Sequence, residues 1–127
     1  PYYRFPTNTT IYTKDAQLVK VINQTGLVED LPKGFNATVK GERSFSWRSD
    51  KDATIVFVKA LDGGDPSKNI AFRDEVFEVD APFSGTPKSL LKTVNRYSNI
   101  RWGNETTAIA TDRLWKSRNT KSYVFDP

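Results

Sequence analysis

The chain consists of short runs of β-branched and aromatic residues, and each run ends at a cluster of turn-forming residues. No window of about 11 residues or longer repeats apolar side chains at the i, i+3, i+4 and i+7 spacing of an amphipathic helix. Hydrophobic residues make up 37% of the 127 residues, which is sufficient for a packed core. We therefore predict an all-β chain with antiparallel strands.

The first two predicted strands lie close together in the sequence. Residues 9–13 and 17–22 are separated by the polar turn 14–16, a spacing that is typical of a β-hairpin. Residues 23–42 are rich in glycine and show little periodicity, so we expect a long surface connection there.

Four further strands are predicted in the middle of the chain, and we expect them to form one four-stranded meander with Trp47 buried. Glycine, proline and aspartate separate these strands because they supply turn conformations or remove a backbone donor. The predicted strands are residues 43–48, 54–60, 75–80 and 88–93.

The pattern then starts again. Phe45-Ser46-Trp47, a polar turn and an apolar run are echoed by Ile100-Arg101-Trp102, a second polar turn and a second apolar run. Repeats of about 40–50 residues with four strands each are typical of β-propeller blades. The alternative is that two antiparallel meanders share this simple pattern by chance.

On the propeller interpretation, the chain holds about two blades of a larger ring. Residues 9–22 would end one blade, 43–93 would form a complete blade, and 96–127 would start the next, all within one partial domain, 1–127. Such a piece leaves strand edges and blade faces uncovered, so we expect the isolated chain to self-associate.

The composition excludes several kinds of active site. The chain has no histidine and no cysteine, so it cannot contain a Ser-His-Asp triad, a Cys-His dyad or a zinc finger. It also lacks a Gly-x-Ser-x-Gly nucleophile motif. The acidic run Asp62-Gly63-Gly64-Asp65 fits a turn with side-chain-to-backbone bonds better than a calcium loop. We expect no catalytic residue, no metal site and no cofactor in this chain.

Several motifs resemble those of a known family along nearly the whole chain. They are similar, in order and spacing, to a run in the bacterial and plastid glutamyl-endopeptidase branch of the prolyl oligopeptidase family of serine peptidases. The motifs are Arg4-Phe5-Pro6, Arg43-Ser44-Phe45-Ser46-Trp47-Arg48-Ser49-Asp50, Ala60-Leu61-Asp62-Gly63-Gly64-Asp65-Pro66, Arg96-Tyr97-Ser98-Asn99-Ile100-Arg101-Trp102-Gly103 and Trp115-Lys116-Ser117-Arg118.

The resemblance implies an N-terminal β-propeller followed by an α/β-hydrolase domain that carries a Ser-Asp-His triad, and this chain matches the propeller only. We expect a longer parent enzyme that hydrolyses peptides, and an inactive propeller portion that gates and positions the peptide substrate for the hydrolase domain. The run 118–121 departs from the basic run that is common in the family. The alternative is a stand-alone β-sheet module that binds a carbohydrate or a protein through Trp47 and Trp102.

Arginines are the candidate substrate contacts, because a glutamate-selective peptidase needs cations near the substrate carboxylate and arginine binds carboxylates in a bidentate manner. The alternative is that they bridge blades by pairing with backbone carbonyls or with acids such as Asp50 and Asp74. The candidates are Arg48, Arg73, Arg96, Arg101 and Arg118.

Charge and hydropathy argue against two further kinds of partner. The net charge is only +4 and acidic residues are interspersed with basic ones, so we expect no nucleic-acid binding. No apolar run is long enough to cross a membrane as a helix. The compartment stays open, with a bacterial periplasmic or secreted location favoured over the cytoplasm.

Overall fold

A computed structural model describes residues 5–27, 29 and 31–127. Arg4, in the first of the family motifs, lies outside these residues. The described part of the chain contains strands and turns but no α-helix. The strands are β1 (Thr7–Tyr12), β2 (Leu18–Thr25), β3 (Glu42–Trp47), β4 (Thr54–Ala60), β5 (Asp74–Asp80), β6 (Lys88–Thr93), β7 (Arg96–Asn104), β8 (Thr107–Leu114) and β9 (Asn119–Phe125).

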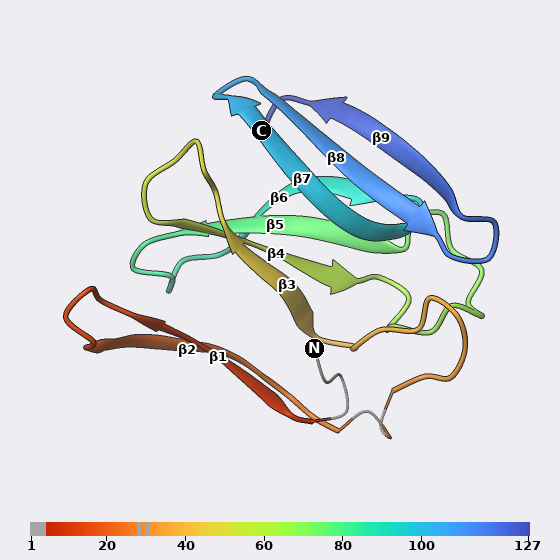
Figure 1. Cartoon of the computed structure of the whole chain (residues 1–127), viewed down its shortest axis with the longest axis horizontal. Helices are drawn as coiled ribbons and strands as arrows, with labels where there is room; N and C mark the ends of the chain where they lie inside the picture. Colours follow the sequence, from red (N-terminus) through yellow and green to blue (C-terminus); the bar gives the residue numbers. More distant parts are fainter. Residues whose placement is uncertain (1–4, 28, 30) are drawn as a thin grey trace.

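The strands form three antiparallel sheets in which each strand pairs with its neighbour in sequence. The sheets are β1-β2, β3-β4-β5-β6 and β7-β8-β9. Figure 1 shows them as three layers, with the four-stranded sheet between the other two. This arrangement confirms the prediction of an all-β antiparallel chain and of one four-stranded meander over residues 43–93.

The four-stranded sheet is packed on both faces. On one face, Ile55 and Phe57 of β4 contact Ile11 of β1, with Ile22 of β2 beside them. On the other face, Val56 and Val58 form a second cluster with side chains of β7. Because β4 is covered on both sides, its sequence is a continuous apolar run rather than an alternating one.

The three sheets do not close into a ring, and the outer sheets have two and three strands. The expected division at residues 9–22, 43–93 and 96–127 coincides with these sheets within a few residues. Their identity as propeller blades remains a prediction.

The prediction that Trp47 is buried is wrong. Trp47 is the last residue of β3, an edge strand, and 56% of its surface is exposed. It lies on the face that only the two-stranded sheet covers, and its ring contacts Phe83 edge-on at a centroid distance of 5.9 Å. Trp102, its counterpart in the repeat, is partly buried against the cluster formed by Val56, Val58 and Val76. The two tryptophans differ because β7 faces a complete sheet and β3 does not.

Among the residues that the structure describes, no helix has the length and hydrophobicity needed to cross a membrane.

Candidate functional site

Two adjoining hollows lie at one end of the molecule, where the segment before β3 meets the loop before β5 and the β8-β9 hairpin. Their volumes are about 220 and 400 Å³. Asn36 and Arg96 border both hollows. The smaller is also lined by Phe35, Pro66, Arg73 and Lys116, and the larger by Arg43, Ser44, Tyr97 and Trp115.

Arg96, the first residue of β7, is the centre of this region. Its guanidinium donates to both carboxylate oxygens of Asp62, at 2.9 and 2.7 Å, and to Asp74 at 3.0 Å. Its Nε donates to the carbonyl oxygen of Asn36 at 2.6 Å. Arg96 is 8% exposed and both carboxylates are buried, so these bonds are shielded from water. Arg96 thus ties together β7, β5, the 61–66 loop and the segment before β3.

Asp62 holds its position through its own loop. Its Oδ1 accepts a hydrogen bond from the backbone N–H of Gly64 at 2.9 Å, which confirms the predicted turn with side-chain-to-backbone bonds. Burial alone would raise the pKa of Asp62, but hydrogen bonds from Arg96 and Arg73 outweigh it and hold the pKa below its usual value. Asp62 is therefore a carboxylate at neutral pH.

Gly64 brings two loops into close contact. A Cβ at this position would lie 2.0 Å from the carbonyl oxygen of Thr38, and the φ angle of Gly64 is +81°. Both the space and the backbone conformation therefore require glycine here. The Thr38 N–H donates to the Gly64 carbonyl at 3.1 Å and fixes the segment that contains Asn36.

Asn36 joins the hollows to the β8-β9 hairpin. It has a φ angle of +68°, a conformation that asparagine tolerates better than most residues. Its Oδ1 accepts a hydrogen bond from the backbone N–H of Trp115 at 3.2 Å.

Arg43 and Tyr97 form the inner wall of the larger hollow. Arg43 pairs with Asp74, whose Oδ2 also accepts the backbone N–H of Tyr97 at 2.7 Å. Burial lowers the pKa of Arg43, and the nearby Asp74 opposes that effect. Burial raises the pKa of the Tyr97 hydroxyl to about 12.

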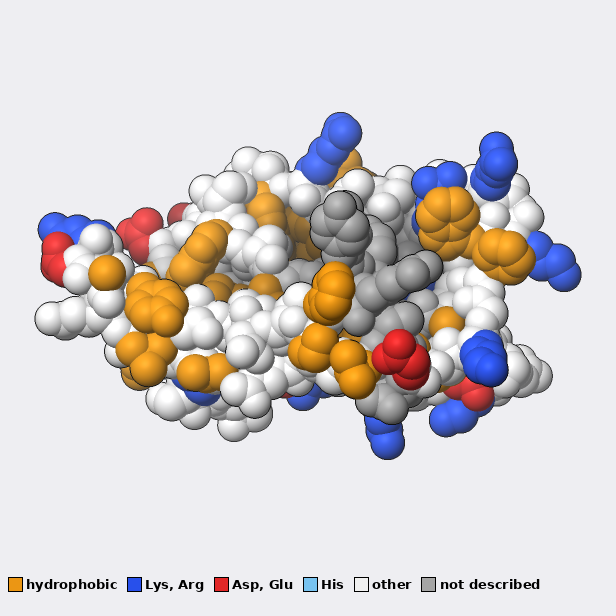
Figure 2. All heavy atoms as spheres, turned by 60° about the horizontal axis from the view of Figure 1, so that its bottom comes forward, with side chains coloured by type: hydrophobic (Ala, Val, Ile, Leu, Met, Phe, Trp, Pro, Cys, Tyr) orange, Lys and Arg blue, Asp and Glu red, His pale blue; other side chains and the backbone are white. Residues whose placement is uncertain are grey.

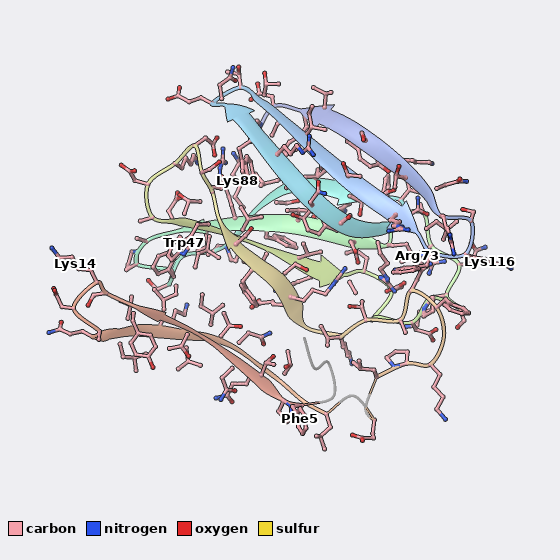
Figure 3. All side chains as sticks on the ribbon, in the orientation of Figure 1. Phe5, Lys14, Trp47, Arg73, Lys88 and Lys116 are labelled. Atoms are coloured by element: carbon pink, nitrogen blue, oxygen red, sulfur yellow. The ribbon has the colours of Figure 1, made fainter. Side chains whose placement is uncertain are left out.

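The outer rim of the hollows is cationic and aromatic. Arg73 donates to Asp62 at 3.0 Å and keeps 25% of its side chain exposed. Lys116 is exposed and makes no hydrogen bond or ion pair with the described residues. Phe35 is 83% exposed and Trp115 is 56% exposed, with the Arg113 guanidinium 4.7 Å from the Trp115 ring centre. Figure 3 shows Arg73 and Lys116 at the same end of the molecule.

Arg48 lies away from this region, beyond the opposite end of β3 from Arg43. It pairs with Asp50 and with Glu78, both at 2.5 Å, and its guanidinium stacks 4.1 Å from the centre of the Trp102 ring. The hydrogen bond to Asp50 is the largest of the effects that raise the pKa of Arg48. This arginine joins the middle sheet to β7 and has no free face for a substrate.

The five predicted arginines are therefore only partly brought together. Arg73 and Arg96 line the smaller hollow, whereas Arg48 belongs to a separate network. Arg101 and Arg118 are exposed and line neither hollow. Arg48 pairs with Asp50 and Arg96 pairs with Asp74, as the predicted alternative has it, whereas the bridging of blades by these pairs stays a prediction.

Most residues that line the hollows were not among the predicted site residues, and they include Phe35, Asn36, Lys116 and Trp115. Gly34, just before Phe35 and Asn36, indicates a turn. Nothing in the sequence shows that this turn contacts the β8-β9 hairpin, because Asn36 and Trp115 are 79 positions apart along the chain. No group of three or more histidine, cysteine, aspartate or glutamate side chains in the described ranges could hold a metal ion.

Comparison with known proteins finds two plant relatives. An Arabidopsis thaliana protein named "Probable glutamyl endopeptidase, chloroplastic" is 35% identical over 129 aligned residues that include the whole chain. A protein of the same name from Oryza sativa subsp. japonica is 33% identical over the same length. The chain spans 13% and 14% of these two proteins. No protein-family model and no solved structure matches it.

The chain is thus related in sequence to a small part of two proteins that are named as probable glutamyl endopeptidases. This supports the resemblance to a peptidase family. The part that matches contains no histidine and cannot supply a Ser-His-Asp triad.

Proposed function

We propose that this chain is a non-catalytic, substrate-positioning region of a serine peptidase of the prolyl oligopeptidase type, in its glutamyl-endopeptidase branch. The observation that carries the proposal is the match of the whole chain to part of two proteins named glutamyl endopeptidase. The chain has no histidine and no cysteine, so the proposal assigns the catalytic groups to another part of the protein. They belong to an α/β-hydrolase domain in the same protein.

The arrangement of the sheets supports a role as part of a β-propeller. Three antiparallel sheets, one hairpin and two meanders, follow one another in the sequence and pack face to face, as propeller blades do. In such a ring the middle sheet is one complete blade and the outer sheets are incomplete blades. The ring covers the hydrolase domain, restricts access to peptides and presents loop side chains to them.

Labelling by an active-site reagent tests the proposal. A serine-directed phosphonate should label the full-length product of the gene and leave the 127-residue chain unlabelled. The full-length reading frame should also contain a Gly-x-Ser-x-Gly motif followed by aspartate and histidine. A full-length product without that motif and without labelling contradicts the proposal. It favours the second candidate, a stand-alone binding module, for which the exposed ring of Trp47 is the supporting observation.

Exposed hydrophobic side chains on the two outer sheets support the proposal that further sheets cover these faces in the full-length protein. Figure 2 shows hydrophobic side chains spread over the face on which β1 and β2 lie. Those exposed on β1 and β2 are Tyr12, Leu18, Val19 and Val21, and Val124 of β9 is 74% exposed on the opposite outer sheet.

We therefore expect the isolated chain to self-associate through these faces or through its free strand edges. Light scattering over a range of micromolar concentrations should give a mass above that of one 14.4 kDa chain. A mass of one chain at every concentration would contradict this expectation.

A further inference from the structure

We infer that the loops at the Lys116 end of the molecule bind the surface of an anionic lipid bilayer, with aromatic rings in the headgroup layer and cations against the lipid phosphates. Three segments form this loop surface: residues 33–36, 61–73 and 115–118. Binding at the surface of a bilayer needs no segment that crosses it. The inference goes beyond the proposed function and does not depend on it.

The three segments of the loop surface are held together. Asn36 accepts a hydrogen bond from the backbone N–H of Trp115 at 3.2 Å, which joins the first segment to the third. Phe35, Arg73 and Lys116, one from each segment, line the same hollow. Figure 3 shows Arg73 and Lys116 together at this end of the molecule. The loop surface is therefore one continuous region that can meet a bilayer as a unit.

Each segment places an exposed aromatic residue within two positions of a cation. The pairs are Lys33 with Phe35, Phe72 with Arg73, and Trp115 with Lys116, and the aromatic residues are 83%, 43% and 56% exposed in that order. The cores of protein–protein interfaces are depleted of charged residues. At a bilayer surface, aromatic rings lie at the level of the headgroups and long cationic side chains reach the phosphates beside them. The interspersed pattern therefore favours a lipid surface over a protein partner.

The loop surface carries an excess of positive charge. Its three segments contain five lysine and arginine residues and two aspartates. Asp62 is buried and paired with Arg73, and Asp65 accepts a hydrogen bond from Ser67. Four of the five cations are exposed and form no ion pair with the described residues: Lys33, Lys68, Lys116 and Arg118. The right-hand end of Figure 2 shows hydrophobic side chains with Lys and Arg side chains around them. This charge is complementary to that of anionic lipid headgroups.

The apolar residues of the loop surface differ in position from those on the outer sheets. Tyr12, Val21 and Val124 belong to the strands β1, β2 and β9, and further sheets could pack on them. Sheets that pack face to face bury strand residues, and the loops at the ends of the strands stay open. Packing of further sheets therefore does not account for the exposed rings of the loop surface.

Vesicle flotation tests the inference on the 127-residue chain, because self-associated protein does not float without lipid. The probes are vesicles of phosphatidylcholine alone and vesicles of equal parts phosphatidylcholine and phosphatidylglycerol. The chain should bind the anionic vesicles about tenfold more tightly than the neutral ones, and added salt should weaken this binding. Equal binding to the two kinds of vesicle, or no binding to the anionic ones, overturns the inference.

Two tryptophans at opposite ends of the molecule locate the bound surface. Trp47 and Trp115 are each 56% exposed, and Figure 3 shows Trp47 far from Lys116. On anionic vesicles with brominated acyl chains, bromine should quench the fluorescence of Trp115. Trp115→Phe should therefore remove most of the quenching, and Trp47→Phe should retain it. Loss of quenching in Trp47→Phe instead would place the other end of the molecule on the bilayer and overturn the inference.

Two lysine variants test the contribution of local charge. Lys116→Glu should weaken binding to the anionic vesicles about tenfold, because it replaces an exposed cation of the loop surface by an anion. Lys14→Glu makes the same change in the β1-β2 turn, which lies far from Lys116 in Figure 3, and should change binding by less than about twofold. Equal effects of the two substitutions would show attraction by net charge alone and would overturn the loop surface as the binding site.

The full-length product of the gene should bind the same anionic vesicles. If the 127-residue chain binds them and the full-length product does not, another part of the protein covers the loop surface, and the inference is overturned. Phosphonate labelling of the full-length product bears on the proposed function alone, so the two outcomes are separable.

Discussion

Two buried arginine networks lie beyond opposite ends of β3, and they differ in how completely their charges are paired. Around Arg48, two carboxylates share one buried arginine, and Lys51 and Lys88 approach Glu78 from outside at 3.3 and 3.7 Å. Around Arg96, three arginines share two carboxylates, and hollows open beside them. The first network is closed by the ring of Trp102.

This difference shows that a buried arginine is not in itself a sign of a ligand site. Both networks contain arginines from the family-like motifs, and both join the middle sheet to β7. Among the described residues, only the network with more arginines than carboxylates borders a hollow. The two networks therefore differ both in the balance of their charges and in the free space beside them.

The largest effect should come from removing the centre of the open network. Arg96→Met leaves Asp62 and Asp74 buried with fewer partners, and uncompensated buried charge of this kind costs about 3–5 kcal/mol of unfolding free energy. Arg96→Lys should lose less unfolding free energy, because lysine keeps the positive charge although it cannot form the two parallel hydrogen bonds of the guanidinium to Asp62. Urea unfolding followed by tryptophan fluorescence measures both variants.

The control for this variant is Arg101→Met, because Arg101 is exposed and borders neither hollow. Its unfolding free energy should stay within about 0.5 kcal/mol of the original chain. If Arg96→Met lost no more stability than Arg101→Met, Arg96 would not be the element that holds the four segments together.

The sequence predicts the fold better than it predicts the networks, and the reason is the range of the interactions. The apolar run of β4 and the turn residues around it act locally, so the strands of the middle sheet are predicted to within a residue or two. The pairing of Arg96 with Asp62 joins positions 34 apart, and it exists only because the 61–66 loop folds back onto β7.

The exposure of Trp47 likewise depends on packing between sheets that the local sequence does not determine. Its place in the repeat indicates a packing position, but burial depends on which sheet covers that face. The two-stranded sheet contributes Ile11 and Ile22 to the cluster around Ile55 and Phe57, but it leaves more than half of the Trp47 surface exposed. Pattern in the sequence therefore gives the face of a strand, and the neighbouring layer determines its exposure.

A smaller loss is expected from the closed network. Arg48→Met should cost about 2 kcal/mol, because Lys51 and Lys88 still reach Glu78 and methionine still covers Trp102. Adding Glu78→Gln to this variant should recover part of the loss, since it removes the carboxylate that the first change left poorly paired. The same urea experiment compares them. A loss as large as that of Arg96→Met would mean that the lysines do not compensate.

The smallest effect distinguishes the networks by their response to acid. The pKa of Asp62 lies below its usual value because hydrogen bonds from Arg96 and Arg73 outweigh burial, and the pKa of Asp50 is lowered by its hydrogen bond from Arg48. A lowered pKa in the folded state contributes stability above the unfolded value of about 3.9, and that contribution is lost as the pH falls through the folded pKa.

Asp62→Asn and Asp50→Asn should therefore each lose less unfolding free energy than the original chain between pH 5 and pH 2, although Asp62→Asn is less stable at neutral pH. The reduction should be larger for Asp62, whose side chain is fully buried, than for Asp50, whose side chain is 10% exposed. Asp126→Asn, at an exposed residue that forms no ion pair with the described residues, should follow the original curve. Urea unfolding at several pH values measures these slopes. If Asp62→Asn kept the full acid dependence, the Asp62 carboxylate would not be the group that Arg96 and Arg73 hold ionised.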